Sequence, residues 1–282
     1  MKQPIVNIDP YPITRIEPPN NKINLGLHEL WEYGDLIWLL VVREIKVRYK
    51  QTIIGGTWAI IQPLLTMVVF TILFDKLAKL PSDDIPYPVF SFCALVPWTY
   101  FTHALTKSST SLVYDRALLT KVYFPRLIIP IAAVLGGLMD FFISFLMLLL
   151  LLGWYGIVPN SSIIFLPFFI LLIILTALAV GLWLSAINVE YRDVSNMLPF
   201  LVQIWLFITP IAYSSTLIPE KWQFLYGLNP MAGVIEGFRW TLLNKEMPAF
   251  SLMLVSSLMT LCLLIGGLYF FKRREDYFTD VI

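Results

Sequence analysis

The sequence predicts an all-α integral membrane protein with six transmembrane helices, an N-terminal interfacial helix, and an outer re-entrant helix pair between spans five and six. Composition is the first observation behind this expectation. Of the 282 residues, 58% are hydrophobic and only 14% are charged, whereas soluble domains carry about 25% charged residues. The second is that long apolar runs alternate with short charged blocks, as in a chain that crosses a bilayer repeatedly. The third is an uneven distribution of lysine and arginine among those blocks, which fixes an orientation.

The chain begins with a polar, proline-rich stretch over residues 1–24. We interpret it as an extended cytosolic tail, because it lacks the apolar core of a signal peptide. Residues 25–282 are expected to form a single membrane domain. Its first element, Leu27–Lys50, contains the apolar run Leu36–Val42, which is far shorter than the about 20 residues that a bilayer requires. Its tryptophans and cationic end are typical of a helix that lies in the membrane interface.

Three spans are expected in the first half of the chain, at Gly56–Phe74, Tyr87–Thr106 and Leu127–Leu152. The third contains a single acid, Asp140, whose charge costs about 2.5–3.5 kcal/mol at the centre of a membrane helix. No cation and no second acid lies in the same span. We therefore expect Asp140 to form a hydrogen bond to a neighbouring helix, with Gly136-Gly137 permitting the close contact that this requires.

Spans two and three are separated by a cationic block, Lys107–Arg126. Arg116, Lys121 and Arg126 mark this block as cytosolic under the positive-inside rule. The block suits a handle that a soluble partner protein grips. It equally suits a solvated loop whose cations only set the topology, and the charges alone leave both interpretations open.

The second half is expected to contain spans at Ile163–Ile187, Met197–Tyr213 and Phe250–Phe271. A second charged cytosolic turn, Asn188–Asp193, joins the first two of these. The segment Ser214–Ala249 is too polar to cross a bilayer and too apolar for a free loop. It is the segment in which the sequence departs most from a simple series of spans.

Two prolines, Pro219 and Pro230, divide this segment into two short helices. Irregular backbone survives at membrane depth only where protein or a water-filled cavity shelters it, so we expect a re-entrant pair that dips in from the outer face. Glu236 and Arg239, spaced i and i+3, are expected to form an ion pair there.

The distribution of cations then orients the chain. Of the 20 Lys and Arg residues, the expected outer segments hold only Lys76, Lys79, Lys221, Arg239 and Lys245. The others lie in the tail, the interfacial helix, the two charged turns and the residues after the last span. Six spans with this asymmetry place both termini in the cytosol.

Several kinds of chemistry have no motif in this sequence. It contains no G-x-x-x-x-G-K-[ST] loop for nucleotide phosphates, no histidine or cysteine cluster with metal-ligand spacing, and no pair of buried carboxylates for acid–base catalysis. The repeats and multiple intramembrane polar residues of an ion-driven transporter are also missing. We therefore expect a protein that is not an enzyme, has no cofactor of its own, and binds no nucleic acid.

From about Ile45 to Ile282 the sequence resembles the transmembrane subunits of bacterial ABC exporters for cell-surface polysaccharides, namely O-antigen, capsule and teichoic acid. The motifs that carry the resemblance are Lys46-Val47-Arg48-Tyr49-Lys50-Gln51, Gln62-Pro63-Leu64, Tyr87-Pro88-Val89-Phe90, Pro97-Trp98, Lys121-Val122-Tyr123-Phe124-Pro125-Arg126, Asn188-Val189, Tyr191-Arg192-Asp193, Thr209-Pro210-Ile211-Ala212-Tyr213, Asn229-Pro230-Met231 and Phe238-Arg239. Each motif is weak alone, and their order and spacing make the set strong.

The resemblance implies a permease that exports a lipid-linked, O-antigen-like polysaccharide across the bacterial inner (cytoplasmic) membrane. It implies a homodimer that works with two copies of a separate ATPase subunit, which would hold ATP and Mg. The substrate would be a polyprenyl-pyrophosphate-linked glycan. The alternative is an ABC permease of the same fold that exports teichoic acid, capsule, lipid or a drug.

The resemblance also implies roles for individual residues. Contacts that couple the permease to its ATPase are expected at Tyr114, Asp115, Arg116, Lys121, Arg126, Tyr191, Arg192 and Asp193. Contacts with the substrate head group at its entrance are expected at Arg43, Arg48 and Lys50. Aromatic rings stack on the C–H faces of sugars, and the channel-lining candidates, chosen by helical facing, are Phe70, Phe74, Phe200, Gln203 and Phe207. For these aromatics, ordinary packing or lipid contact remains an alternative.

Overall fold

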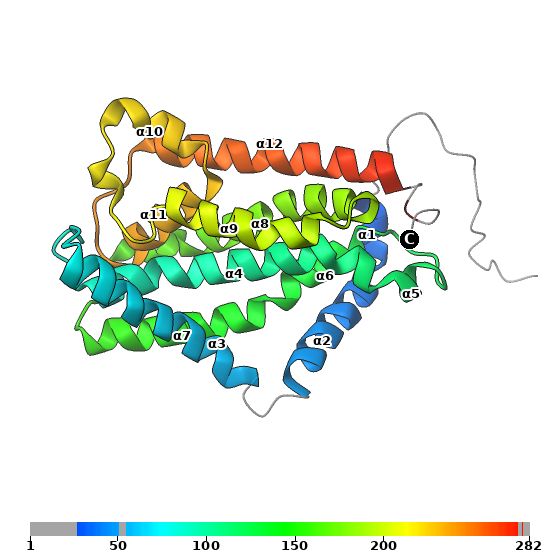
Figure 1. The fold of residues 1–282 in the computed structure, drawn as a ribbon, viewed down its shortest axis with the longest axis horizontal. Coiled ribbons are helices and arrows are strands. Elements are labelled where there is room, and N and C mark those ends of the chain that lie inside the picture. The colour runs from blue at the N-terminus through cyan, green and yellow to red at the C-terminus, as the bar shows by residue number, and fades with distance from the viewer. Residues whose placement is uncertain (1–26, 51–54, 276–277, 279–282) are drawn as a thin grey trace, which may run out of the picture.

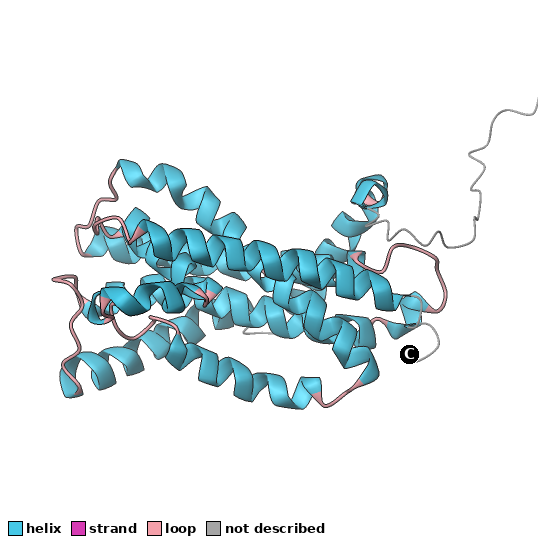
Figure 2. Cartoon of the chain, turned by 90° about the horizontal axis from the view of Figure 1, so that it is seen from above, coloured by secondary structure: helices cyan, strands magenta, loops and turns pink. Residues whose placement is uncertain are grey.

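The computed structural model describes residues 27–50, 55–275 and 278, and this part of the chain forms helices and connecting turns without a strand (Figures 1 and 2). The long helices run roughly along one axis, so the molecule is an elongated bundle (Figure 1). The all-α class predicted from the sequence is therefore confirmed for the described residues. The expected tail, residues 1–24, lies outside them.

The described elements, in chain order, are α1 (Leu27–Glu32), α2 (Gly34–Lys50), α3 (Gly55–Phe70), the π-helical turn η1 (Thr71–Leu77), α4 (Tyr87–Tyr114), α5 (Arg116–Leu119), α6 (Ile128–Gly136), α7 (Leu138–Trp154), the short helical turn η2 (Ser161–Phe165), α8 (Leu166–Glu190), α9 (Val194–Ile208), the short helical turn η3 (Ser215–Leu217), α10 (Glu220–Gly227), α11 (Pro230–Leu242) and α12 (Phe250–Arg274). Four described stretches are long and apolar enough to cross a membrane: Ile60–Leu77, Ile128–Trp154, Ser161–Glu190 and Phe250–Arg274. The chain is a multi-pass membrane protein.

Helix α4 is the centre of the bundle, because it packs against α3, α6, α7, α8, α9 and α11. Most of its side chains are buried, among them Phe92, Leu95 and Phe101. Where α4 crosses α8, a Cβ atom on Gly181 would lie 2.5 Å from Oγ of Ser108. A larger residue would force the two helices apart, so this glycine sets how closely they pack.

The second expected span was placed at Tyr87–Thr106, and this boundary is wrong. Helix α4 continues to Tyr114, so the first part of the cationic block is helical. Its hydroxyl groups bond to carbonyls one turn earlier, as Ser111 Oγ does to the Ser108 carbonyl at 2.7 Å. Such bonds pair the hydroxyls of Ser109, Thr110 and Ser111 within the helix, whereas the buried Oγ of Ser108 has no hydrogen-bond partner.

The third expected span, Leu127–Leu152, consists of two helices, α6 and α7, which meet at Gly137. The hydroxyl of Tyr100 on α4 donates a hydrogen bond to the Val134 carbonyl at 3.2 Å, beside the break. A side chain inserted into the backbone ladder is a common cause of a helix break.

Two further boundaries differ from those predicted. Asn188 belongs to α8, which continues to Glu190, so only Tyr191–Asp193 remain in the turn. The Asn188 side chain is buried, and its Nδ2 donates to the Ser109 carbonyl at 3.0 Å. Helix α9 ends at Ile208 rather than continuing to Tyr213. Pro210 cannot donate the next backbone hydrogen bond, and the residue before it adopts the extended conformation that proline favours.

The two ends of the bundle hold different elements. At the α5 end, the backbone N–H of Arg126 donates to Glu275 at 3.0 Å, and Glu190 forms an ion pair with Arg274. These contacts bring α5, the α8–α9 turn and the end of α12 together. At the opposite end, termed the α11 end, lie α10, α11 and the loop that precedes α4 (Figure 1).

Candidate functional site

Three groups of polar side chains organise the structure: one at the α5 end, one within the bundle and one at the α11 end. At the α5 end, α2 is bound to the end of α4. Nη2 of Arg43 lies 2.8 Å from Oδ1 and 2.7 Å from Oδ2 of Asp115, the residue between α4 and α5. Asp115 therefore faces α2 through its side chain, while Arg116 and Ala117, which follow it in α5, are exposed.

Most of the predicted ATPase-coupling residues are exposed at this end. Tyr114 is 83% exposed and Tyr191 is 63% exposed. Arg116, Lys121, Arg192 and Asp193 are exposed too, whereas Asp115 and Arg126 are half-buried. The structure brings the two predicted contact regions, Tyr114–Arg126 and Tyr191–Asp193, to the same end of the bundle. Their role in coupling stays a prediction.

Within the bundle, four polar side chains from three helices meet. Arg48 and Tyr49, on α2, both contact Asp140 on α7: Arg48 through an ion pair and Tyr49 through a hydrogen bond that its hydroxyl donates. Nη1 of Arg48 also lies 2.7 Å from Nε2 of His103 on α4. We call Arg48, Tyr49, His103 and Asp140 the intramembrane cluster.

This cluster corrects the sequence-based account of Asp140. Because no cation lies in the same span, the sequence predicted only a hydrogen bond from Asp140 to a neighbouring helix. The hydrogen bond exists, but Asp140 also forms an ion pair with Arg48, which reaches it from α2. A glycine at position 136 allows this approach, because a Cβ there would lie 3.0 Å from Cβ of Glu44 on α2.

The intramembrane cluster borders a cavity of about 280 Å³ between α2, α3, α4 and α7. Hydroxyl, amide, imidazole and guanidinium groups contribute much of its wall. The lining residues are Arg48, Gln62, Pro63, Thr99, Tyr100, Thr102, His103, Thr106, Gly137, Asp140, Phe141 and Ser144. Such a wall offers donors and acceptors to a polar ligand or to several water molecules, each of which takes about 30 Å³ in liquid water.

The three cations predicted to contact a substrate head group occupy different environments. Arg43 is bound to Asp115, and Arg48 is bound to Asp140. Lys50 is exposed at the end of α2. Two of the three therefore face acidic partners in the bundle, and their contact with a head group remains a prediction.

The candidate channel residues fall into two sets. Phe70 and Phe74 are half-buried, and their rings meet edge to face with centroids 5.1 Å apart. Phe200 and Phe207 are 64% and 62% exposed and lie with the exposed Gln203 along α9. The described part of the chain thus leaves this face of α9 uncovered, and its role as a channel wall stays a prediction.

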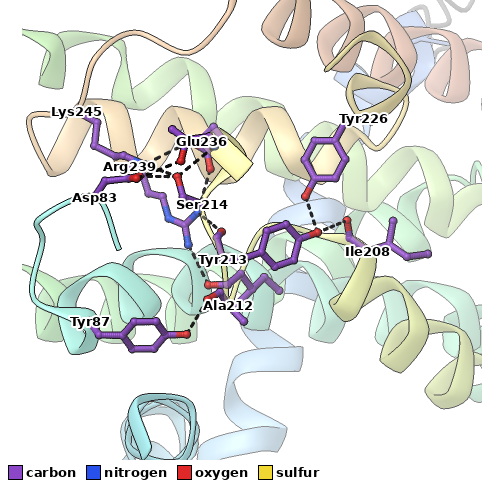
Figure 3. A network of polar contacts seen from close by, with 12 residues as sticks. Asp83, Tyr87, Ile208, Ala212, Tyr213, Ser214, Tyr226, Glu236, Arg239 and Lys245 are labelled. Atoms are coloured by element: carbon purple, nitrogen blue, oxygen red, sulfur yellow. Dashed lines mark hydrogen bonds and ion pairs between the residues drawn. The ribbon is translucent and has the colours of Figure 1, made fainter. Parts of the chain in front are cut away.

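At the α11 end, the predicted pair of Glu236 and Arg239 is confirmed. Both side chains are almost fully buried, and Nη1 of Arg239 lies 2.9 Å from Oε1 of Glu236 (Figure 3). Arg239 also donates to the Ile211 carbonyl at 2.9 Å and the Tyr213 carbonyl at 3.2 Å. Its guanidinium lies 3.6 Å from the centroid of the Phe90 ring. The buried charge is therefore stabilised from several sides.

The irregular segment after α9 is the part of the chain that this network holds in place. Besides the two bonds from Arg239, the Tyr87 hydroxyl donates to the Ala212 carbonyl at 2.7 Å (Figure 3). The backbone carbonyls of Ile211, Ala212 and Tyr213, which follow α9, thus accept hydrogen bonds from side chains of α4 and α11. Buried backbone groups outside a helix need such partners. This explains why the Thr209–Tyr213, Tyr87–Phe90 and Phe238-Arg239 motifs occur together.

A second set of bonds joins the end of α9 to the start of α11. Asn229 caps α11 by accepting from the Met231 backbone N–H at 3.1 Å, and its Oδ1 also accepts from Trp205 Nε1 at 2.9 Å. Its Nδ2 donates to Thr209 Oγ1 at 3.0 Å. One amide side chain therefore fixes the angle between two helices.

Sequence reasoning missed Asp83 and Lys245 as members of this network. Lys245 forms an ion pair with Asp83, which also accepts hydrogen bonds from Ser214 and Thr216 (Figure 3). Burial alone would raise the pKa of Asp83, but the bonds from Lys245, Ser214 and Thr216 outweigh it and hold that pKa below its usual value. Asp83 has a left-handed backbone, with φ of 53°, a strained conformation that can mark a fixed loop.

Within the described residues, no group of three or more His, Cys, Asp or Glu side chains could hold a metal ion. The polar groups instead pair with one another across helices. The arrangement can bind a polar or anionic ligand in the central cavity and a protein partner at the α5 end.

Comparison with known proteins gives a consistent result. The family described as ABC-2 type transporter matches residues 35–243. An O-antigen export system permease protein RfbA from Myxococcus xanthus is 30% identical over 255 residues, which cover 89% of this chain and 97% of the relative. A protein of the same name from Klebsiella pneumoniae is 26% identical over 262 residues, 93% of this chain and 98% of the relative.

A more distant similarity extends to a second kind of relative. The polysialic acid transport protein KpsM of Escherichia coli is 26% identical over 251 residues, which cover 84% of this chain and 92% of that protein. The family match, over residues 35–243, includes most of α2, all four residues of the intramembrane cluster and all of α11, so it concerns much of the bundle rather than one motif.

Proposed function

The chain belongs to the ABC-2 type transporter family, and we propose that it is the permease subunit of an ABC transporter that exports a lipid-linked, O-antigen-like polysaccharide. The observation that carries this proposal is its similarity to O-antigen export permeases over nearly their whole length. The chain is a transport subunit, and ATP hydrolysis belongs to a separate ATPase subunit that holds ATP and Mg.

Six spans follow from the helices when α4 and α9 are added to the four long apolar stretches. Helix α4 has 28 residues, about 42 Å at 1.5 Å per residue, which exceeds a hydrocarbon core of about 30 Å. Helix α9 has 15 residues, about 22 Å, and the irregular segment held by Arg239 extends it. Helices α10 and α11 form the re-entrant pair between the last two spans.

The α5 end faces the cytosol of a bacterial cell, and the membrane is the inner (cytoplasmic) one. Support comes from the cations Arg116, Lys121, Arg192 and Arg273, which are exposed at this end and satisfy the positive-inside rule. Both termini are then cytosolic, and the α11 end faces outward.

The working assembly is a homodimer of this chain with two copies of the ATPase subunit. The exposed turns Tyr114–Arg126 and Tyr191–Asp193 lie at one end of the bundle and offer two adjacent contacts to each ATPase copy. Motion of the ATPase reaches α2 through the Arg43–Asp115 pair. Exposed aromatics of α9, Phe200 and Phe207, face the dimer channel and contact the moving glycan.

The substrate is a polyprenyl-pyrophosphate-linked glycan that approaches from the membrane. Arg43, Arg48 and Lys50 on the interfacial helix receive its head group. The same fold could instead export capsule, teichoic acid, a lipid or a drug. Similarity to a polysialic acid transport protein favours a capsule-like polymer among these alternatives.

Reconstitution in lipid vesicles tests the proposal. With the ATPase subunit present, ATP should drive a polyprenyl-pyrophosphate-linked glycan across the bilayer, and the chain alone should hydrolyse no ATP. Parallel vesicles supplied with teichoic acid, capsule polymer or a drug distinguish the alternatives. ATP hydrolysis by the chain alone, or glycan transport without any ATPase, would overturn the proposal.

A further inference from the structure

We propose that the end of α12 positions both predicted ATPase-coupling turns, through two adjacent positioning residues, Arg274 and Glu275. Glu275 holds the first turn, residues 121–126, and Arg274 holds the second turn, residues 191–193. This inference rests on the proposed function, because it concerns how the permease presents its turns to the ATPase subunit. Neither of the two residues is among those predicted to touch that subunit.

The first turn is held through its backbone. The N–H of Arg126, the last residue of this turn, donates to Oε1 of Glu275 at 3.0 Å. This amide lies just before the start of α6, where a negative charge is favourable because of the helix dipole. One carboxylate therefore fixes the backbone at the point where the turn meets the next helix.

The Glu275 carboxylate is itself fixed by α12. Its other oxygen, Oε2, lies 2.7 Å from Nζ of Lys272, and only 13% of the Lys272 side chain and 15% of the Glu275 side chain are exposed. Because little water reaches the pair, its attraction is screened less than that of a surface ion pair. The bond to Arg126 thus connects the first turn to the end of a long apolar helix.

The second turn is held through the helix that precedes it. Arg274 forms an ion pair with Glu190, the last residue of α8, directly before residues 191–193. The Arg274 guanidinium also lies 4.6 Å from the centroid of the Phe270 ring, and a cation–π contact of this kind restricts its orientation. Two neighbouring residues of the chain therefore hold two different turns.

Apolar packing supports the same arrangement. Phe124 of the first turn and Val189 near the end of α8 are buried in one hydrophobic cluster with Phe271 and Phe278. The rings of Phe271 and Phe278 meet edge to face, with centroids 5.2 Å apart. Side chains beside both turns therefore share a core with the end of α12.

The two turns need such support because they are irregular and present exposed side chains. Tyr123 in the first turn is 92% exposed, and Tyr191 begins the second. A partner that contacts both turns must find them at a fixed separation, and any ordering that has to occur on binding lowers its affinity. Bonds from one helix end preorganise the two turns as a single surface.

Hydrogen exchange of the permease in nanodiscs tests the two bonds separately. Glu275→Ala should speed exchange in residues 121–126 and leave residues 191–193 nearly unchanged, and Arg274→Ala should do the reverse. Faster exchange of both turns in each variant would indicate general loosening of this end of the bundle. That result, or unchanged exchange in both variants, would overturn the inference.

Two further variants act as controls. Glu275→Gln keeps an acceptor for the Arg126 N–H and should restore protection of the first turn. Arg273→Ala alters the exposed neighbour of both positioning residues and should change neither turn.

The functional measurement is the affinity of the same nanodiscs for the ATPase subunit, with the maximal rate of ATP hydrolysis at saturation. Glu275→Ala should weaken the affinity about tenfold, the scale of one charge-assisted hydrogen bond. Arg274→Ala should weaken it about threefold, because its ion pair is more solvated. The maximal rate should change little, since binding can still order the turn. Misfolding would instead lower the amount of ATPase bound at unchanged affinity.

The outcomes separate this inference from the proposed function. If the wild type binds the ATPase subunit and the folded variants bind it equally well, the inference fails and the proposed function stands. Arg274→Ala gives this answer even where Glu275→Ala does not fold. If the wild type binds no ATPase subunit, the proposed function fails, and the inference fails with it.

Discussion

Arg43 binds both carboxylate oxygens of Asp115, at 2.8 Å and 2.7 Å, across 72 residues of sequence. The pair joins α2 to the short segment that follows α4. Both contacts come from one nitrogen, Nη2, so the pair is a charge-assisted contact that holds the two side chains close together. We expect a displacement of α5 to act on α2, which carries two residues of the intramembrane cluster, Arg48 and Tyr49.

Breaking this pair should uncouple ATP hydrolysis from export. In Asp115→Lys, two cations face each other, so α2 no longer follows α5, and we expect ATP turnover with little glycan exported. The double variant Arg43→Asp/Asp115→Lys should recover part of the coupling. The measurement for both variants is the amount of glycan exported per ATP hydrolysed in proteoliposomes.

Reversal of an exposed charge at the same end provides the control. Arg273→Glu alters a side chain that is exposed at the end of α12 and should leave coupling intact. Because the Arg43–Asp115 pair is partly solvated, its loss should cost stability only about 1 kcal/mol or less. Normal coupling in Asp115→Lys would return the cationic block to a purely topological role.

Loss of Glu236 should destabilise the protein strongly. Glu236→Ala leaves the buried Arg239 guanidinium with only carbonyl and aromatic partners, and removal of one member of a buried pair costs about 3–5 kcal/mol. Thermal unfolding in detergent should show a clear fall in midpoint. Glu246→Ala, at an exposed position nearby, should show almost none.

Aspartate should replace the function of Asn229 in part, and alanine should not. Asn229→Asp keeps the acceptor for Met231 N–H and Trp205 Nε1 but loses the donor to Thr209. Asn229→Ala loses all three bonds, including an N-cap that contributes about 0.5–2 kcal/mol. We therefore expect the alanine variant to unfold at a lower temperature than the aspartate variant, and the reverse order would contradict the capping role.

The loop before α4, at the α11 end, should loosen in acid. Asp83 has a folded-state pKa below its usual value, so its ion pair stabilises the folded loop above the unfolded pKa of about 3.9. That stabilisation is lost as the pH falls through the lower, folded-state pKa. Hydrogen exchange of the loop should show protection at pH 7 that disappears in this acidic range.

The matching variant separates this effect from general acid unfolding. Asp83→Asn removes the charge that Lys245 binds, so its loop should exchange faster already at pH 7 and change less on acidification. A wild-type loop that stays protected well below the folded-state pKa would show that the ion pair does not hold it.

The exposed aromatic residues on α9 should affect the rate of glycan export and have little effect on protein stability. Phe200→Ala and Phe207→Ala remove rings that are 64% and 62% exposed, so stability should change little while the export rate falls severalfold at unchanged ATP affinity. Phe168→Ala, on α8 and 50% exposed, is the control. Equal effects at all three positions would indicate lipid contact rather than a channel wall.

Local patterns in the sequence were enough to predict the apolar helices and the contacts between residues that are close in the chain. Hydropathy predicted the last span at Phe250–Phe271, which lies within α12 (Phe250–Arg274), and the i,i+3 spacing predicted the Glu236–Arg239 pair. Both predictions depend only on residues that are close in the chain. Helix ends were harder to predict. Helix α4 passes Thr106 because its hydroxyls bond to its own carbonyls, and no composition rule distinguishes that from a polar turn.

Contacts between distant residues escaped prediction for a physical reason. Asp140 was assigned no cation because none lies in its span, yet Arg48 reaches it from another helix. The sequence analysis gave Asp83 no partner, yet Lys245 forms an ion pair with it. A charge finds its partner through the packing of whole helices, which depends on glycines, breaks and side-chain volumes across the bundle.

By itself, the amino-acid sequence determined that this chain is a membrane protein, and it located the charged turns. It also showed which family the chain resembles. Hydrophobicity and the order of motifs can both be read directly from the sequence. Only the tertiary structure decided which charges neutralise one another: Arg43 with Asp115, Arg48 with Asp140, and Lys245 with Asp83. A charge in a low-dielectric environment must be paired, and the identity of its partner is set by the packing of the helices.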